Sequence, residues 1–142
     1  MPVFEKAVKD LRDRGIDVVV HTIFGLPKEE KDDMIETIRY LSSKDIQGIK
    51  IHLLHLMKDT LMVRLYEDGK MKFMSQEEYI ELIGKAISLL PPGVVVHRVT
   101  GDAPRDLLIE PQWSLKKWEV LNAIDKYLED NDIYQGKEYV EK

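Results

Sequence analysis

Residues Ile16–Pro27 read IDVVVHTIFGLP, a nearly unbroken run of apolar and β-branched side chains that ends in a Gly-Leu-Pro turn. β-Branched residues favour strands. A run with so few polar interruptions is typical of a strand that is buried on both faces, as in a parallel sheet. The sequence therefore predicts a buried parallel strand over residues 16–24, followed by a sharp turn.

The same alternation of helix and strand continues on either side of this run. Further β-branched runs predict strands, and apolar residues spaced three and four apart predict helices. The predicted strands are residues 16–24, 49–56 and 94–99, and the predicted helices are residues 4–11, 29–41, 75–90 and 114–128. Connections of a dozen residues or more between strands are typical of parallel pairing. We therefore expect an α/β fold with a parallel sheet, and loops over residues 57–74 and 101–113.

Three parallel strands make an unusually small sheet for a chain of 142 residues. Both outer strands would leave backbone groups unpaired. Either a strand is hidden in the loops, or the chain is a piece of something larger, or it pairs with a copy of itself. We expect residues 1–128 to form the folded body and residues 129–142 to form a loosely held polar tail.

The composition excludes several classes of function. The 26 acidic and 21 basic residues give a net charge of −5, and there is no cysteine. An acidic chain without a basic run predicts binding to neither nucleic acid nor an anionic membrane. Without cysteine, this chain holds no disulfide, no thiolate zinc site and no iron–sulfur cluster of its own. The longest stretch without a charged residue, Ala86–His97, is too short to span a membrane. With no signal-peptide pattern at the start, we expect a cytoplasmic protein.

The four histidines all fall near the carboxyl ends of the predicted strands. These are His21, His52, His55 and His97. Ligands of parallel α/β folds bind at that edge of the sheet. Arg98 lies at the end of the last predicted strand and Asp102 just after it, so we expect a ligand-facing rim, although any single histidine could instead be a core residue.

A metal site made by this chain alone is not expected. His52 and His55 are three residues apart, which sends their side chains to opposite faces of a regular strand. There is no His-x-His or His-x-x-x-His pair, and Asp102 is the one obvious carboxylate nearby.

Three of these segments resemble radical S-adenosylmethionine (radical SAM) enzymes. His21–Glu29 (HTIFGLPKE) is similar to the Gly-Leu-Pro-Gly-Glu segment that follows the fifth strand of many such enzymes. The other two segments resemble an uncharacterised subfamily, often labelled Fe–S oxidoreductase, that is related to the elongator catalytic subunit and to oxygen-independent coproporphyrinogen dehydrogenase. They are residues 49–55 (IKIHLLH) and 97–103 (HRVTGDA). Lys28 stands where the commonest family form has glycine, and Glu30 where it has threonine.

The resemblance implies a partial (β/α)6 barrel of the TIM-like kind, of which this chain is the carboxyl-terminal half. In the family, three cysteines of the amino-terminal half hold a 4Fe–4S cluster that binds S-adenosylmethionine. By that likeness Ile23, Phe24 and Gly25 line the adenine pocket through backbone contacts. The residues implied to face the substrate are His52, His55, His97, Arg98 and Asp102.

The full-length enzyme would thus form a 5′-deoxyadenosyl radical that abstracts a hydrogen atom from the substrate. Arg98 suits an anionic group of that substrate, and His97 or His52 suits a proton donor. The chain alone would bind neither cofactor and would be inert. Its partners would be the missing half of the barrel, an unknown substrate and, through the open sheet edge, a second copy. Two other readings stay open: a self-contained histidine-metal hydrolase and a non-enzymatic interaction domain.

Overall fold

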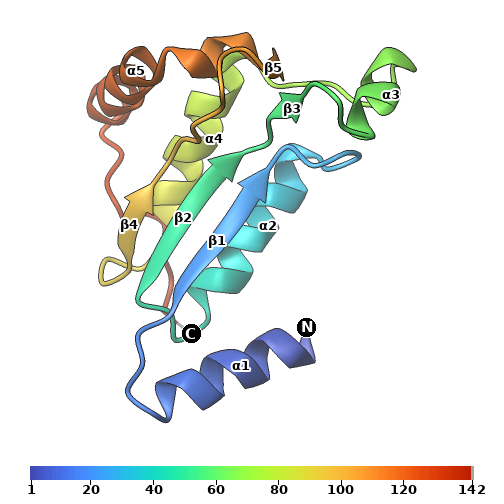
Figure 1. The fold of residues 1–142 in the computed structure, drawn as a ribbon. Coiled ribbons are helices and arrows are strands. Elements are labelled where there is room, and N and C mark those ends of the chain that lie inside the picture. The colour runs from blue at the N-terminus through green and yellow to red at the C-terminus, as the bar shows by residue number, and fades with distance from the viewer. Residues whose placement is uncertain (142) are drawn as a thin grey trace.

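The computed structural model describes residues 1–141, which alternate between helices and strands as the sequence predicts (Figure 1). The helices are α1 (Pro2–Arg12), α2 (Lys31–Ser42), α3 (Met62–Glu67), α4 (Gln76–Leu89) and α5 (Lys117–Asp130), with a 3-10 turn, η1 (Gln112–Leu115). The strands are β1 (Val19–Phe24), β2 (Gly48–Leu53), β3 (Leu56–Met57), β4 (Val95–Arg98) and β5 (Leu108–Glu110). Among these residues, no helix combines the length and apolarity needed to cross a membrane.

The main sheet has the order β1-β2-β4, and both of its strand pairs are parallel. Val19 of β1 lies opposite Gly48 of β2, which lies opposite Val95 of β4. The predicted α/β class with a parallel sheet is therefore confirmed. The described residues form an arc of three strands rather than a closed barrel.

The prediction that the first strand is buried on both faces is wrong. Thr22 and Phe24 point into the core, whereas Val19 and Ile23 are 38% and 45% exposed. α2 and α4 lie on one side of the sheet, and the other side is left uncovered by residues 1–141 (Figure 1). An apolar run indicates that a strand can be buried on both faces. It does not show which other segment, if any, covers the second face.

Helix starts are fixed by side chains that satisfy free backbone N–H groups. The Ser75 hydroxyl accepts from the backbone N–H of Glu78, and the Glu78 carboxylate accepts from that of Ser75, as the sequence pattern indicates. Glu30 and Asp33 form the equivalent box at α2. The core then forms between the helices and one face of the sheet, around Phe24, Ile38, Ile51 and Ile83, which are all fully buried.

Both predicted loops contain regular structure. β3 pairs antiparallel with β5, so that Leu56 lies opposite Glu110, and α3 occupies the first of the two loops. A hidden strand pair therefore exists, but it forms a separate small sheet and does not extend the parallel one.

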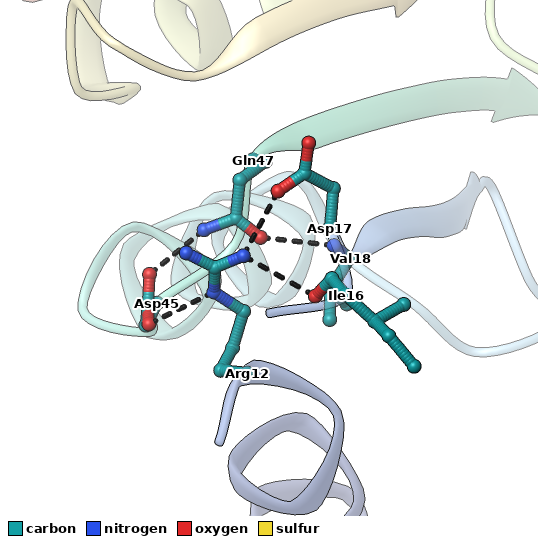
Figure 2. A network of polar contacts seen from close by, with 6 residues as sticks. All are labelled: Arg12, Ile16, Asp17, Val18, Asp45 and Gln47. Atoms are coloured by element: carbon teal, nitrogen blue, oxygen red, sulfur yellow. Dashed lines mark hydrogen bonds and ion pairs between the residues drawn. The ribbon is translucent and has the colours of Figure 1, made fainter. Parts of the chain in front are cut away.

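Arg12 ties α1 to the amino-terminal end of the main sheet (Figure 2). Its guanidinium donates to the Ile16 carbonyl at 3.2 Å, to Asp17 at 2.9 Å and to Asp45 at 3.1 Å. Gln47 links the same Asp45 to the backbone N–H of Val18 (Figure 2). The network thus holds the residues just before β1 and β2 together.

The carboxyl-terminal segment is more firmly held than the polar composition predicts. α5 continues to Asp130, and the side-chain amide of Gln135 donates to the carbonyls of Pro91 and Val94, both at 2.6 Å. Glu138 pairs with Lys85 and accepts from the Ser88 hydroxyl. These contacts fasten residues 131–141 to the end of α4.

Candidate functional site

The uncovered side of the parallel sheet carries most of the polar residues that the sequence singles out. We call it the open face. It consists of alternate residues of β1 and β2 and three residues of β4. Its members are Val19, His21, Ile23, Gly48, Lys50, His52, Val95, His97 and Arg98.

A register shift in β4 brings two adjacent residues to this face. Val96 pairs with Ile49, but Lys50 pairs with Arg98, so His97 is an extra residue on β4. A bulge of this kind re-aims side chains. The His97 ring consequently lies over Gly48, where a Cβ would come within 2.6 Å of its Nε2 atom, while Arg98 faces Lys50 across the sheet.

The expected common rim of four histidines is only partly present. The rings of His21 and His52 stack with centroids 5.4 Å apart. His97, in contrast, contacts Gly48 at the start of β2, four residues or about 13 Å along the strand from His52. The cause is that β4 starts level with the beginning of β2 and ends level with Lys50. The carboxyl end of β4 therefore lies short of the carboxyl edge of the sheet, where β1 and β2 end.

His55 lies beyond the end of β2, against the backbone of Gly101. A Cβ at Gly101 would come within 2.6 Å of the His55 ring, so only glycine leaves room for the imidazole. The Nε2 atoms of both His52 and His55 are buried without a hydrogen-bond partner in the described chain. Burial is the main cause that lowers the pKa of each of these histidines.

Asp102 lies beside the first residue of α5, Lys117. Lys117 donates to its two carboxylate oxygens at 2.8 and 3.0 Å, and Arg98 lies 3.5 Å away. The hydrogen bond from Lys117 is the main cause that lowers the pKa of Asp102. Asp102 is thus an ionised carboxylate held mainly by a lysine that the sequence does not single out.

The Gly-Leu-Pro turn at the end of β1 is organised by Glu29. One carboxylate oxygen of Glu29 accepts from the backbone N–H groups of Gly25 and Leu26, both at 3.0 Å. Gly25 has a φ of 88° and Lys28 a φ of 70°, the conformation that favours glycine. The turn therefore keeps a glycine-like backbone at Lys28. It borders a cleft of about 470 Å³, whose opposite wall includes Met71, Phe73 and Met74.

The predicted adenine-binding residues divide between the core and the surface. The Phe24 side chain is fully buried, so only its backbone can face a ligand, whereas the Ile23 side chain is exposed on the open face. The exposed Ile23 side chain lies beside Gly25, which has no side chain. An apolar surface of this kind fits the flat face of an adenine ring. The residues therefore fit this part of S-adenosylmethionine, whereas a chain without cysteine does not fit the cluster.

Lys50 is a charged residue of the open face that the sequence pattern does not single out. It lies between Ile49 and Ile51, which are fully buried, and it shares the open face with His52 two residues further on. The strand period of two could have revealed the pair. Residues 1–141 bring together no group of three histidine or carboxylate side chains suited to a metal ion.

The two partly buried histidines predict a dependence of stability on pH. Their pKa lies below the ordinary value of about 6.5, so the unfolded chain takes up their protons first as the pH falls. The stabilisation is complete well above pH 6.5 and is lost progressively as the pH falls through that value. We expect the urea midpoint to fall between about pH 7.5 and 5.5, a window above the ordinary carboxylate titration. A His52→Gln/His55→Gln variant should show a smaller fall, and an equal fall would contradict the assignment.

Comparison with known proteins identifies the family. Residues 46–130 match the Radical_SAM C-terminal domain model. The chain therefore belongs to the radical SAM family and is a carboxyl-terminal part of such a protein, which confirms the resemblance found in the sequence.

The relatives are longer than this chain. The uncharacterized protein YtqA of Bacillus subtilis is 51% identical over 134 residues, which cover 94% of this chain and 42% of YtqA. Protein YhcC of Escherichia coli K12 is 30% identical over 130 residues, which cover 92% of this chain and 42% of YhcC. The matched region thus spans less than half of both curated relatives.

A solved structure shows the same fold. The archaeal Methanocaldococcus infernus Elp3 with an N-terminal deletion (1–46) superposes with a TM-score of 0.76 at 21% identity, covering 92% of this chain and 32% of that chain. The structural match shows that the described part of this chain shares its α/β fold with part of that protein.

Proposed function

We propose that this chain forms the half of a radical SAM barrel that contacts the adenine of S-adenosylmethionine and the substrate. The observation that carries the proposal is the open face, which places Ile23 beside the Gly25 turn and basic side chains on the same surface. Family membership supports it, because ligands of parallel α/β barrels bind at the carboxyl-terminal ends of the strands. When bound, the cluster and S-adenosylmethionine of the whole enzyme would supply a radical that removes a substrate hydrogen atom.

The chain's own residues would bind and orient. The backbone of residues 23–25 and the Ile23 side chain would border the adenine. Arg98 would orient an anionic group of the substrate, and His52, whose pKa is lowered by burial, would exchange a proton with the substrate. His55 and Asp102 would border the same space, and His97 would form the wall nearer the amino-terminal ends of the strands.

The free edge of β1 is the proposed attachment line for the rest of the barrel. In residues 1–141, β1 pairs with β2 alone, and its open-face residues Val19 and Ile23 are partly exposed. An uncovered strand edge is a template for another strand. The missing half of the barrel is the proposed occupant, and a second copy is the alternative for the isolated chain.

The experiment compares the full-length protein with this chain. The full-length protein, reconstituted anaerobically with iron and sulfide and then reduced, should form 5′-deoxyadenosine from S-adenosylmethionine. An Ile23→Asp variant should lose about tenfold or more of that rate, because a charge beside the adenine is costly to desolvate. Val3→Asp, at a residue of α1 that is 84% exposed, is the control and should retain the rate.

The isolated 142-residue chain, treated in the same way, should show neither cluster absorbance nor 5′-deoxyadenosine. Turnover by the isolated chain would overturn the proposal that the cluster is held by the other half of the barrel. Equal rates for Ile23→Asp and Val3→Asp would overturn the proposal that Ile23 borders the adenine.

A further inference from the structure

Three basic residues form a row across the three strands of the open face. In the strand register, His21 of β1 lies opposite Lys50 of β2, and Lys50 lies opposite Arg98 of β4. Neighbouring strands are about 4.8 Å apart, so these side chains leave the sheet next to one another. We call His21, Lys50 and Arg98 the basic row.

His52 extends the basic row toward the carboxyl end of β2. Its ring stacks on that of His21 at a centroid distance of 5.4 Å. Its Nε2 atom is buried and has no partner among the described residues. After burial, the neighbours that lower the pKa of His52 are His21, Arg98 and Lys50, so the imidazole lies among positive charges.

No carboxylate on the open face balances these charges. None of its nine residues is acidic, although the whole chain carries a net charge of −5. Asp102 lies 3.5 Å from Arg98 but is held closer by Lys117, at 2.8 Å. The ion pairs next to this face join Asp102 to Arg98 and to Lys117, and none among residues 1–141 involves Lys50, so the Lys50 ammonium group is available to a ligand.

We propose that the basic row and His52 bind an oxyanion, a phosphate or a carboxylate, on the open face. Arg98 offers a planar fork of donors, Lys50 offers a compact ammonium group, and the His52 imidazole offers an N–H. The inference deepens the proposed function and rests on it for its biological ligand, because the open face is the side assigned there to the substrate. The anion has two possible sources, which are an anionic group of the substrate and the carboxylate of S-adenosylmethionine.

The test titrates the 142-residue chain with sulfate while the histidine resonances are followed by NMR. Sulfate stays a dianion throughout the histidine range, so a change of affinity with pH reports the protein. At constant ionic strength we expect saturable shifts of the His21 and His52 signals. Affinity should rise as the pH is lowered past 6.5, because protonation of His52 adds a positive charge beside the site. The charged groups facing His52 are His21 on β1, Lys50 on β2 and Arg98 on β4, with His55 and Asp102 beyond the strand ends.

Substitutions with matched controls locate the site. Lys50→Gln and Arg98→Gln should each weaken sulfate binding by about tenfold, since each removes a charged donor. Lys126→Gln and Arg14→Gln remove equal charges from helix α5 and from the residues after α1, and should leave the affinity unchanged. Absence of saturation, or equal loss in the test and control variants, would overturn the proposal.

Competition in the reconstituted full-length protein, which has the other half of the S-adenosylmethionine site, distinguishes the two sources of the anion. Displacement of sulfate by S-adenosylmethionine but not by 5′-methylthioadenosine, which lacks the carboxylate, would assign the site to the cofactor's carboxylate. Retention of sulfate in the presence of both would assign it to the substrate. Both results support an oxyanion site. The readout does not involve radical chemistry, so a failure of 5′-deoxyadenosine formation in the full-length protein would leave it unaffected.

Discussion

Phe24→Ala should destabilise the isolated chain by about 3–5 kcal/mol, the cost of removing a fully buried aromatic ring and leaving a cavity. The adjacent Ile23→Ala should cost about 1 kcal/mol or less, because the Ile23 side chain is 45% exposed on the open face. Urea denaturation followed by circular dichroism would measure both.

The Ile23 variant is a matched control, since it shortens an apolar side chain one residue away on the same strand. Losses of similar size would mean that both faces of β1 are covered in solution, as they would be in a tight self-associated form. Sedimentation over a range of concentrations would then show that association directly.

Tyr79→Ala should also cost about 3–5 kcal/mol, and Tyr79→Phe about 1–3 kcal/mol. The Tyr79 ring is fully buried beside Trp113, at a centroid distance of 5.5 Å, and burial raises the pKa of its hydroxyl. That hydroxyl donates to the Val99 carbonyl at 2.8 Å, so phenylalanine leaves a carbonyl without its partner.

The phenylalanine variant separates the hydrogen bond from the packing. Because Val99 follows Arg98 directly, we also expect faster amide hydrogen exchange over residues 98–102 in Tyr79→Phe than in the wild type. Unchanged stability and exchange in this variant would show that the bond does not hold the residues after β4.

The sequence predicts the parallel strands well because each is a β-branched run bounded by a turn. The runs over residues 16–24 and 94–99 contain β1 and β4, and the capping pattern at Ser75 begins α4 as expected. The run over residues 49–56 matches β2 only as far as Leu53, because Leu56 belongs to β3 in the other sheet. Local signals of this kind are contained within a few residues, so tertiary structure does not need to be known.

The remaining features depend on contacts between distant segments. β3 and β5 are two and three residues long, and they pair across about fifty positions, too short a pattern to recognise in either segment. The bulge at His97 is a property of the register between β2 and β4, not of either strand alone. The bulge is why Arg98 faces Lys50, whereas His97 departs from the expected rim because β4 starts level with the beginning of β2.

The basic row has a thermodynamic consequence for a barrel that closes over it. In the open arc, water solvates and screens the like charges of Lys50 and Arg98, so that they coexist at little cost. Closure would remove part of that water and strengthen their repulsion, unless a counter-charge entered at the same time. Ligand capture and closure are then linked equilibria, each of which favours the other, and the anion becomes a structural component of the closed state.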